Sequence, residues 1–235
     1  MIQGLPLIVT RSDPGGMATV ARAQAMGIDA RHFPLFEARP IEWSMPEGDF
    51  DALLLTSAQA VRLAGPRLSP GGSPQRPTLP ELPVYAVGAA TATAAEKIGR
   101  RVEMTGAGDA QALIDAMTSR NIRRILWLCG RDRSSFDARG MELVALPVYA
   151  VDPVSPPVGW ADAIAAPAVL LAHSARGARR IAACAGAARR HLSLVAISPA
   201  VAGAAGDGWT EISVAARPDD ASMLAAAHKL CQKGQ

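Results

Sequence analysis

Small hydroxyl residues and glycines recur directly after short apolar runs of this 235-residue chain. They are Thr10, Thr56 with Ser57, Gly88, Gly130, Ser174 and Ser198. Each stands where a strand should pass into a helix, and helix N-termini offer unpaired backbone N–H groups to anions. The same residue types are also ordinary helix N-caps, so capping is the alternative role for each one. Taken together, the pattern predicts a cage for carboxylate groups.

Two arginines could add charge to this cage. Arg11 and Arg131 follow Thr10 and Gly130 at matching points of the chain, and a guanidinium binds a carboxylate through two parallel donors. Simple solvation is the alternative, because the chain is rich in arginine: only Lys97, Lys229 and Lys233 are lysines among its 24 Lys+Arg. Most other arginines fall on predicted helices or loops, so the bias is mainly background.

Other catalytic signatures are missing from the sequence. The four histidines share no ligand spacing, and the three cysteines form no CxxC pair, so no metal site is predicted. Thr105–Asp109 resembles a dinucleotide loop, but Gln111 stands where the third glycine would be. We interpret it as a strand-to-helix turn capped by Asp109 and expect no cofactor.

Composition excludes several classes of protein. Residues are 49% hydrophobic and 19% charged, which is typical of a folded globular protein. The longest apolar run, Ala163–Ala172, is too short for a membrane span and contains Pro167. Aromatic residues are only 4% and no basic run occurs, which argues against nucleic-acid binding. Without a signal-peptide pattern or paired cysteines, we expect a cytoplasmic protein that binds no membrane.

Short apolar runs alternate with alanine-rich stretches, as in parallel sheets with crossover helices. The runs predict strands at Leu5–Thr10, Ala30–Phe36, Ala52–Thr56, Pro83–Val87, Arg101–Met104, Ile125–Cys129, Leu143–Tyr149, Ala168–Ala172, Leu192–Ile197 and Glu211–Val214. Helices are expected at Gly16–Met26, Ala58–Leu63, Ala89–Ile98, Ala110–Thr118, Ala175–Ala183, Ala200–Ala204 and Ala221–Leu230. Two five-stranded sheets are expected, because ten strands are at the limit for one open sheet.

An internal repeat indicates how the chain is routed between the two sheets. The segments Ala52–Ser57, Val84–Gly88 and Asp109–Leu113 have echoes at Ala168–Ser174, Leu194–Ser198 and Asp220–Leu224, and Gly27–Phe36 has an echo at Gly140–Tyr149. The first copy carries a longer loop, Gly65–Pro80. The proline-bearing stretches Glu37–Pro46 and Val151–Pro157 are predicted to be linkers.

The repeat therefore predicts a discontinuous first domain of residues 1–37 and 155–235 and a second domain of residues 40–150. Connectors are expected near 38–40 and 150–155. Two crossings of this kind would form a hinge, and the facing loops would form a cleft suited to a ligand.

At this point the chain shows a resemblance that covers nearly its whole length. The motifs, in order, are Thr10-Arg11, Asp51–Ser57 with Ala60-Val61, Val84–Thr91, Gly106–Leu113, Trp127–Arg133, Leu146–Tyr149 and Ala196–Val201. As an ordered set they resemble the uroporphyrinogen-III synthase family. The resemblance implies an α/β fold of two similar parallel-sheet, flavodoxin-like domains, with a two-segment connector and a discontinuous first domain.

The resemblance also implies a cofactor-independent, cyclising lyase of tetrapyrrole biosynthesis. Its substrate would be hydroxymethylbilane, a linear tetrapyrrole rich in carboxylates. Loss of the terminal hydroxyl would give an azafulvene, which ring D attacks to form a spiro intermediate that recloses with ring D inverted. Free substrate closes without inversion, so the enzyme would work mainly through positioning and electrostatics.

Individual residues match functional positions of the family. Tyr149 matches a tyrosine implicated in protonating the departing hydroxyl of the substrate. Its counterpart in the repeat, Phe36, has no phenolic hydroxyl group. The alternative is that Tyr149 only ends a buried strand. Thr91 matches a substrate contact, or is simply a residue of a helix face. Ser57, Ser174 and Ser198 match cleft positions that bind carboxylates.

Three positions depart from the family pattern. Gln59 replaces a usual Asn, and Ala200-Val201 replace threonines of some relatives, which leaves that loop dependent on backbone N–H groups. The expected protein is a monomeric uroporphyrinogen-III synthase. The alternatives are a non-catalytic, two-lobed tetrapyrrole or small-anion binding protein and a two-lobed nucleotide-sugar transferase, although no phosphate loop is recognisable.

Overall fold

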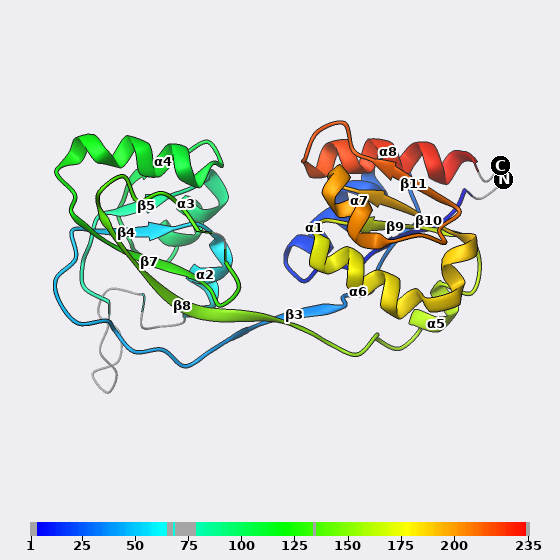
Figure 1. Ribbon diagram of the computed structural model, residues 1–235, viewed down its shortest axis with the longest axis horizontal. Coiled ribbons are helices and arrows are strands. Elements are labelled where there is room, and N and C mark those ends of the chain that lie inside the picture. Colours follow the sequence, from blue (N-terminus) through cyan, green and yellow to red (C-terminus); the bar gives the residue numbers. More distant parts are fainter. Residues whose placement is uncertain (1–3, 65–67, 69–78, 134, 234–235) are drawn as a thin grey trace. The chain divides into compact units, whose positions relative to one another are not determined.

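The structure is a computed structural model and describes residues 4–64, 68, 79–133 and 135–233. The chain divides into two compact units: unit 1 is Met1–Glu37 with Asp152–Gln235, and unit 2 is Ala38–Val151. Each unit has its own sheet with helices on both faces (Figure 1). Most of the predicted long loop Gly65–Pro80 lies outside the described residues.

Unit 1 contains a five-stranded sheet in the order β11-β10-β9-β1-β2. Its strands are β1 (Leu7–Val9), β2 (Ala30–His32), β9 (Ala168–Ala172), β10 (Leu192–Ala196) and β11 (Glu211–Val214). Every neighbouring pair is parallel. The three central strands are buried along their whole length, as expected for a parallel sheet covered on both faces.

Two helical layers cover this sheet. One face packs against α1 (Gly15–Ala25) and α8 (Asp220–Lys233). The other packs against α6 (Ala175–Ala185), α7 (Pro199–Ala205) and the short α5 (Trp160–Ala163). The 3-10 turn Gly186–His191 follows α6. Alanine makes up three of the five buried residues of α6 and α7.

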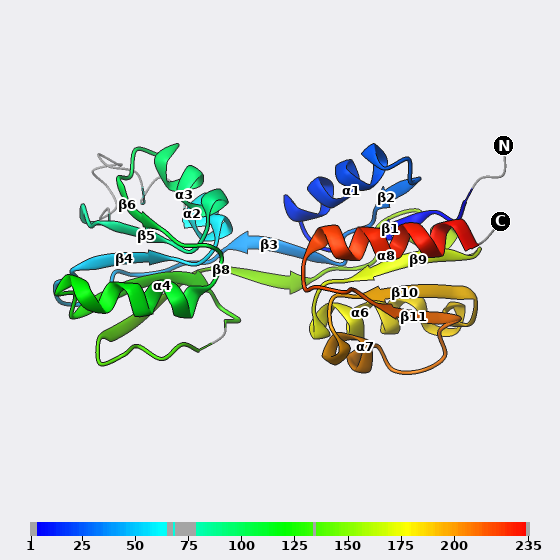
Figure 2. The ribbon, with the colours of Figure 1, turned by 90° about the horizontal axis from the view of Figure 1, so that it is seen from above.

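Unit 2 contains a six-stranded sheet in the order β3-β8-β7-β4-β5-β6. Its strands are β3 (Phe36–Pro40), β4 (Ala52–Leu55), β5 (Val84–Ala86), β6 (Val102–Thr105), β7 (Arg124–Gly130) and β8 (Glu142–Pro153). The helices α2 (Ala58–Ala64) and α3 (Ala89–Glu96) lie on one face (Figure 2). The helix α4 (Ala110–Met117), followed by the 3-10 turn Thr118–Arg120, lies on the other.

Five strands of each sheet have the same arrangement in space, although the chain enters it at different strands, which confirms the predicted pair of similar flavodoxin-like α/β domains. In unit 1 the order is 2-1-3-4-5 when its strands are numbered along the chain. The strands β7, β8, β4, β5 and β6 of unit 2 take the places of β1, β2, β9, β10 and β11. In such sheets the strand order reverses between two central strands, here β1 and β9 in unit 1 and β7 and β4 in unit 2, and ligands bind at the carboxyl ends there.

The prediction of a five-stranded sheet is confirmed for unit 1 and is wrong for unit 2, whose sheet has a sixth strand, β3. The two proline-bearing connectors contain more regular structure than expected. The stretch Glu37–Pro46 begins inside β3, and β8 continues through Val151 to Pro153, so the connectors contain strand. Proline is tolerated at strand ends because no following ladder bond needs its missing N–H, and Pro40 and Pro153 are both terminal. The four-residue helix α5 was also missed, because so short a helix has no visible period.

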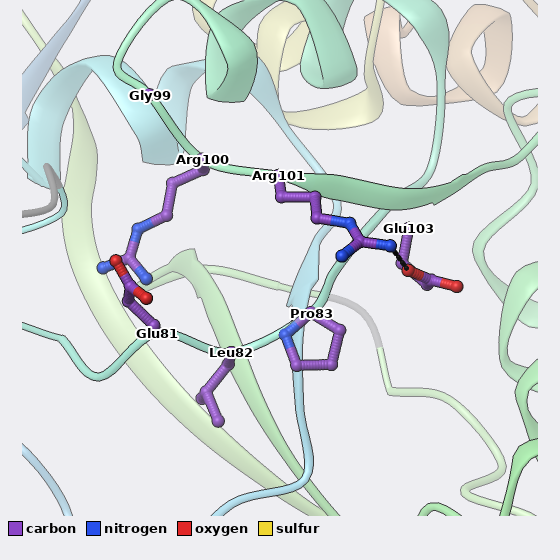
Figure 3. Close-up of a pocket in the computed structure, with 7 residues that line it drawn as sticks. All are labelled: Glu81, Leu82, Pro83, Gly99, Arg100, Arg101 and Glu103. Atoms are coloured by element: carbon purple, nitrogen blue, oxygen red, sulfur yellow. Dashed lines mark ion pairs between the residues drawn. The ribbon is translucent and has the colours of Figure 1, made fainter.

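A buried arginine secures the chain on both sides of the undescribed segment. Arg100 is 4% exposed and donates to the carbonyl oxygens of Leu68 (2.6 Å), Pro80 (2.6 Å) and Leu79 (2.8 Å). Burial lowers its pKa. It lines a hollow of about 280 Å³ at the amino ends of β5 and β6, where Arg101 pairs with Glu103 at 3.5 Å (Figure 3). This hollow is at the opposite end of the strands from the predicted site.

Candidate functional site

The predicted site residues of unit 2 gather at the carboxyl ends of its central strands. Thr56 and Ser57 follow β4, Gly88 follows β5 after one residue, and Gly130 ends β7 with Arg131 next. Because neighbouring parallel strands end at one edge of a sheet, these residues share an edge. The edge includes the point between β4 and β7 where the strand order reverses.

A β-bulge determines where Tyr149 points. Cys129 pairs with Pro147 and Gly130 pairs with Tyr149, so β8 carries Val148 as an extra residue. Side chains normally alternate between faces, yet Val148 and Tyr149 both pack in the core beneath α2 and α3. Without the bulge, Tyr149 would point to the α4 face of the sheet.

Gly130 makes room for the tyrosine ring. A Cβ atom added at Gly130 would lie 3.0 Å from Cζ and 3.2 Å from Oη of Tyr149. The backbone N–H of Arg131 donates to the Tyr149 carbonyl oxygen at 2.8 Å and fixes the register beyond the bulge. The ring therefore lies close to a position where any side chain beyond glycine would meet it.

The Tyr149 hydroxyl is hydrogen bonded to Ser57. Burial raises the pKa of Tyr149 more than the Ser57 hydrogen bond lowers it, so the phenol remains protonated at neutral pH. The Ser57 oxygen also accepts the backbone N–H of Gln59 at 3.1 Å, at the start of α2. Gln59, which stands in place of the family's usual Asn, does not affect this hydrogen bond, because the donor is its backbone N–H group. A half-buried phenol held in this way can act as a general acid.

The other predicted residues of unit 2 have mostly internal contacts. Thr56 Oγ1 accepts the indole N–H of Trp127 at 3.0 Å. Gly88 is the N-cap of α3, and Thr91 sits in its first turn with 6% of its surface exposed. Thr91 thus lies mainly inside the helix layer, next to the edge.

In unit 1, the predicted serines make capping bonds. Ser174 accepts the backbone N–H of Gly177 at 3.0 Å, and Ser198 accepts that of Val201 at 3.4 Å. Thr10 is 4% exposed and donates to the carbonyl oxygen of Leu171 at 3.5 Å. The hydroxyl groups are therefore engaged within the unit.

A carboxylate that sequence reasoning missed occupies the corresponding edge of unit 1. Asp220 accepts from Thr19 Oγ1 (2.8 Å), Arg22 Nε (2.8 Å) and His173 Nε2 (3.1 Å), and lies 3.7 Å from Arg11. Burial alone would raise the pKa of Asp220, but the hydrogen bonds from His173, Thr19 and Arg22 hold it well below its usual value. Arg11, predicted to bind substrate, is thus paired with an internal anion.

The repeat contained a signal for this cluster. It aligned Asp220 with Asp109, the N-cap of α4. In the structure Asp219 is the matching cap, since it accepts the backbone N–H of Ser222 at 2.7 Å, and this frees Asp220 to turn toward the sheet edge. His173 is the other polar residue of the cluster that comparing the two copies of the repeat could have identified. It precedes Ser174 as Thr56 precedes Ser57.

We predict that Asp220→Asn lowers the free energy of unfolding by about 2 kcal/mol at pH 7, because charge-assisted hydrogen bonds are lost. A depressed folded-state pKa contributes stability above the unfolded value near 3.9, and this contribution is lost as the pH falls further. In urea titrations, the difference in free energy of unfolding between the parent and Asp220→Asn should therefore become smaller as the pH falls from about 4 to about 2.

The exposed carboxylate Asp207 provides a matched control in the same unit. Asp207→Asn should leave the free energy of unfolding within about 0.5 kcal/mol of the parent. A gap for Asp220→Asn that stays constant with pH would contradict the proposed charge network.

The described part of the chain offers no metal site. It contains no group of three or more His, Cys, Asp or Glu side chains placed to hold an ion. Its cysteines are free thiols, and burial raises the pKa of Cys129 and of Cys231 to about 11, which keeps both protonated. Among the described helices, none has the length and apolar character needed to cross a bilayer.

A family profile shows the family of the chain, and a solved structure supports its fold. A family profile described as uroporphyrinogen-III synthase HemD matches residues 17–225. The uroporphyrinogen-III synthetase of Helicobacter pylori is similar in structure, with a TM-score of 0.67, 16% identity, and coverage of 96% of this chain and 99% of that one. A mutant uroporphyrinogen III synthase of Thermus thermophilus matches with a TM-score of 0.47, 16% identity, and coverage of 97% and 99%. No sequence among curated proteins matches significantly.

Proposed function

The chain belongs to the uroporphyrinogen-III synthase family, and from this premise we propose how its own residues carry the reaction. Enzymes of this family are cyclising lyases of haem biosynthesis, which convert hydroxymethylbilane into uroporphyrinogen III with ring D inverted. The family match over residues 17–225 carries the assignment. The alternative of a non-catalytic binding protein is not favoured.

We propose that Tyr149 protonates the departing hydroxyl of the substrate. Ser57 accepts the Gln59 N–H, so its own O–H is left to donate to the Tyr149 oxygen. The phenolic proton then remains available for the leaving group. The raised pKa of Tyr149 supports this role, because the acid form persists throughout the neutral range.

Binding of the substrate carboxylates is assigned to the carboxyl edges of both sheets. The residues proposed to form these edges are Thr10, Arg11, Thr56, Ser57, Gly88, Thr91, Gly130, Arg131, Ser174 and Ser198. Since the serine oxygens already cap helices, we propose that backbone N–H groups and Arg131 make most of the contacts to carboxylates, while the buried Thr10 and Thr91 shape the edge.

We also propose that the protein acts as a cytoplasmic monomer without cofactor, nucleic acid or membrane partners. The two units would serve as domains that move about connectors near residues 38–40 and 150–155. The free thiols and the modest net charge of +3 support this proposal.

The product isomer tests the proposed activity. Hydroxymethylbilane is generated in situ, the protein is added, and the porphyrins are resolved after oxidation. We expect the type III isomer to dominate, whereas a binding protein without activity would leave type I, the product of unassisted closure. Type I alone at saturating protein would overturn the proposed activity.

A further inference from the structure

The α4 face of the unit 2 sheet is covered less completely than the matching face of unit 1. In unit 1, the connection from β1 to β2 contains the helix α1. In unit 2, the matching connection from β7 to β8 contains no helix in its described residues, 131–133 and 135–141 (Figure 2). The side chains beneath this connection therefore have no helix over them of the kind that α1 provides in unit 1.

The uncovered place is a hollow of about 780 Å³, within the range of small-molecule sites. Its apolar wall consists of Trp127, Phe136, Leu143 and Ala145. The Trp127 and Phe136 rings are tilted at 56°, with centroids 5.0 Å apart. Trp127 is only 5% exposed, so the aromatic surface that the wall can offer to another planar ring is mainly that of the half-buried Phe136.

The rim of the hollow carries a surplus of positive charge. Arg131, Asp132 and Arg133 all line it, two cations with one anion. The Cζ atom of Arg133 lies 5.9 Å from the centroid of the Trp127 ring, and one Arg131 nitrogen lies 3.7 Å from the Asp132 carboxylate. Arg133 is therefore placed beside the aromatic wall, where it can reach an anionic substituent of a bound ring.

The hollow is linked to the proposed acid through two hydrogen bonds made by adjacent residues. The Trp127 indole N–H donates to Thr56 Oγ1, and the next residue, Ser57, bonds the Tyr149 hydroxyl. Side chains alternate between the two faces of the sheet along this segment, so Thr56 lies on the α4 face and Ser57 lies on the face covered by α2 and α3. The hollow and the acid thus adjoin the same carboxyl end of β4.

We propose that this hollow is a subsite for one carboxylate-bearing pyrrole ring of the substrate. The ring packs against Phe136 next to the edge of Trp127, and Arg133 binds its acetate or propionate group. The proposal rests on the proposed function, because that function supplies a substrate made of such rings. Arg133 then acts on substrate affinity and leaves the protonation step to Tyr149.

Steady-state kinetics test this role of Arg133. We expect Arg133→Met to raise KM about tenfold, since one charge-assisted contact is lost, while kcat changes less than about twofold. The matched control is Arg101→Met, which removes an arginine of the same unit whose side chain is 89% exposed at the other end of the strands. Its KM should equal that of the parent. An unchanged KM in Arg133→Met would overturn the proposal.

A binding measurement makes the test independent of turnover. The probe is a monopyrrole that carries one acetate and one propionate group, titrated into the intact ¹⁵N-labelled protein. The indole N–H resonance of Trp127, assigned with Trp127→Phe, should shift in the parent and in Arg101→Met, and much less in Arg133→Met.

The outcomes separate the subsite from the activity. Formation of the type III isomer together with an unmoved Trp127 resonance would reject the subsite and leave the proposed function intact. A Trp127 shift that follows protein concentration and ignores the pyrrole would instead assign the hollow to contact with a second copy of the chain, and would equally reject the proposal.

Discussion

Replacing Tyr149 by phenylalanine is expected to lower kcat for isomer III formation about a hundredfold, the usual contribution of a positioned general acid. The substitution removes the hydroxyl that Ser57 holds and keeps the ring that packs beside Gly130. KM and the unfolding midpoint should therefore change little. Stopped assays that resolve the two isomers measure this result directly.

The second tyrosine of the chain supplies the control. Tyr85 is 3% exposed in β5, so Tyr85→Phe removes a hydroxyl from the same sheet at a position outside the proposed site. Its kcat should match the parent. If Tyr149→Phe also retained full kcat, the proton would have to come from another group or from water, and Tyr149 would lose the acid role.

The pH dependence of the Tyr149 step follows from its environment. Because burial raises the pKa of Tyr149, the acid form persists to a higher pH than that of a free phenol near 10. A loss of rate near neutral pH would therefore have to come from a different group.

Sequence patterns were sufficient for the α/β layers and for the routing of the chain between the two units. Buried parallel strands are continuous apolar runs, as Leu53–Leu55 and Val169–Leu171 show, and their small polar successors mark the carboxyl edge. The internal repeat then related the two units, because each copy must bury the same faces. These signals are local or periodic, so they can be found in one sequence.

The features that fix the site geometry are not local. The bulge at Val148 arises from the register between β7 and β8, and nothing in the order of apolar residues reports a register shift. The Asp220 cluster joins residues from α1, α8 and the end of β9 that lie far apart in the chain. The absence of a helix from the described residues between β7 and β8 shows in the sequence only as a shorter connection. Its effect on the site depends on which side chains of the sheet face stay exposed, and the order of residues does not report this.

Gly130→Ala is expected to lower kcat about ten- to a hundredfold without unfolding the protein, because small displacements of a catalytic group are costly. The added methyl group would meet Tyr149 Cζ at 3.0 Å, so the ring, and with it the hydroxyl, must shift to relieve the contact. Gly203→Ala is the control, since a Cβ atom there meets no other atom within 4 Å. That variant should keep the parental kcat.

A double-mutant cycle identifies the route by which Gly130 acts. If alanine at Gly130 harms the reaction only by moving the Tyr149 hydroxyl, then adding it to Tyr149→Phe should cost less than about threefold, because the hydroxyl is already gone. Fully additive losses would mean that Gly130 serves the substrate directly, through its backbone beside Arg131. The cycle therefore decides whether the bulge and the glycine position one hydroxyl or build a separate part of the binding edge.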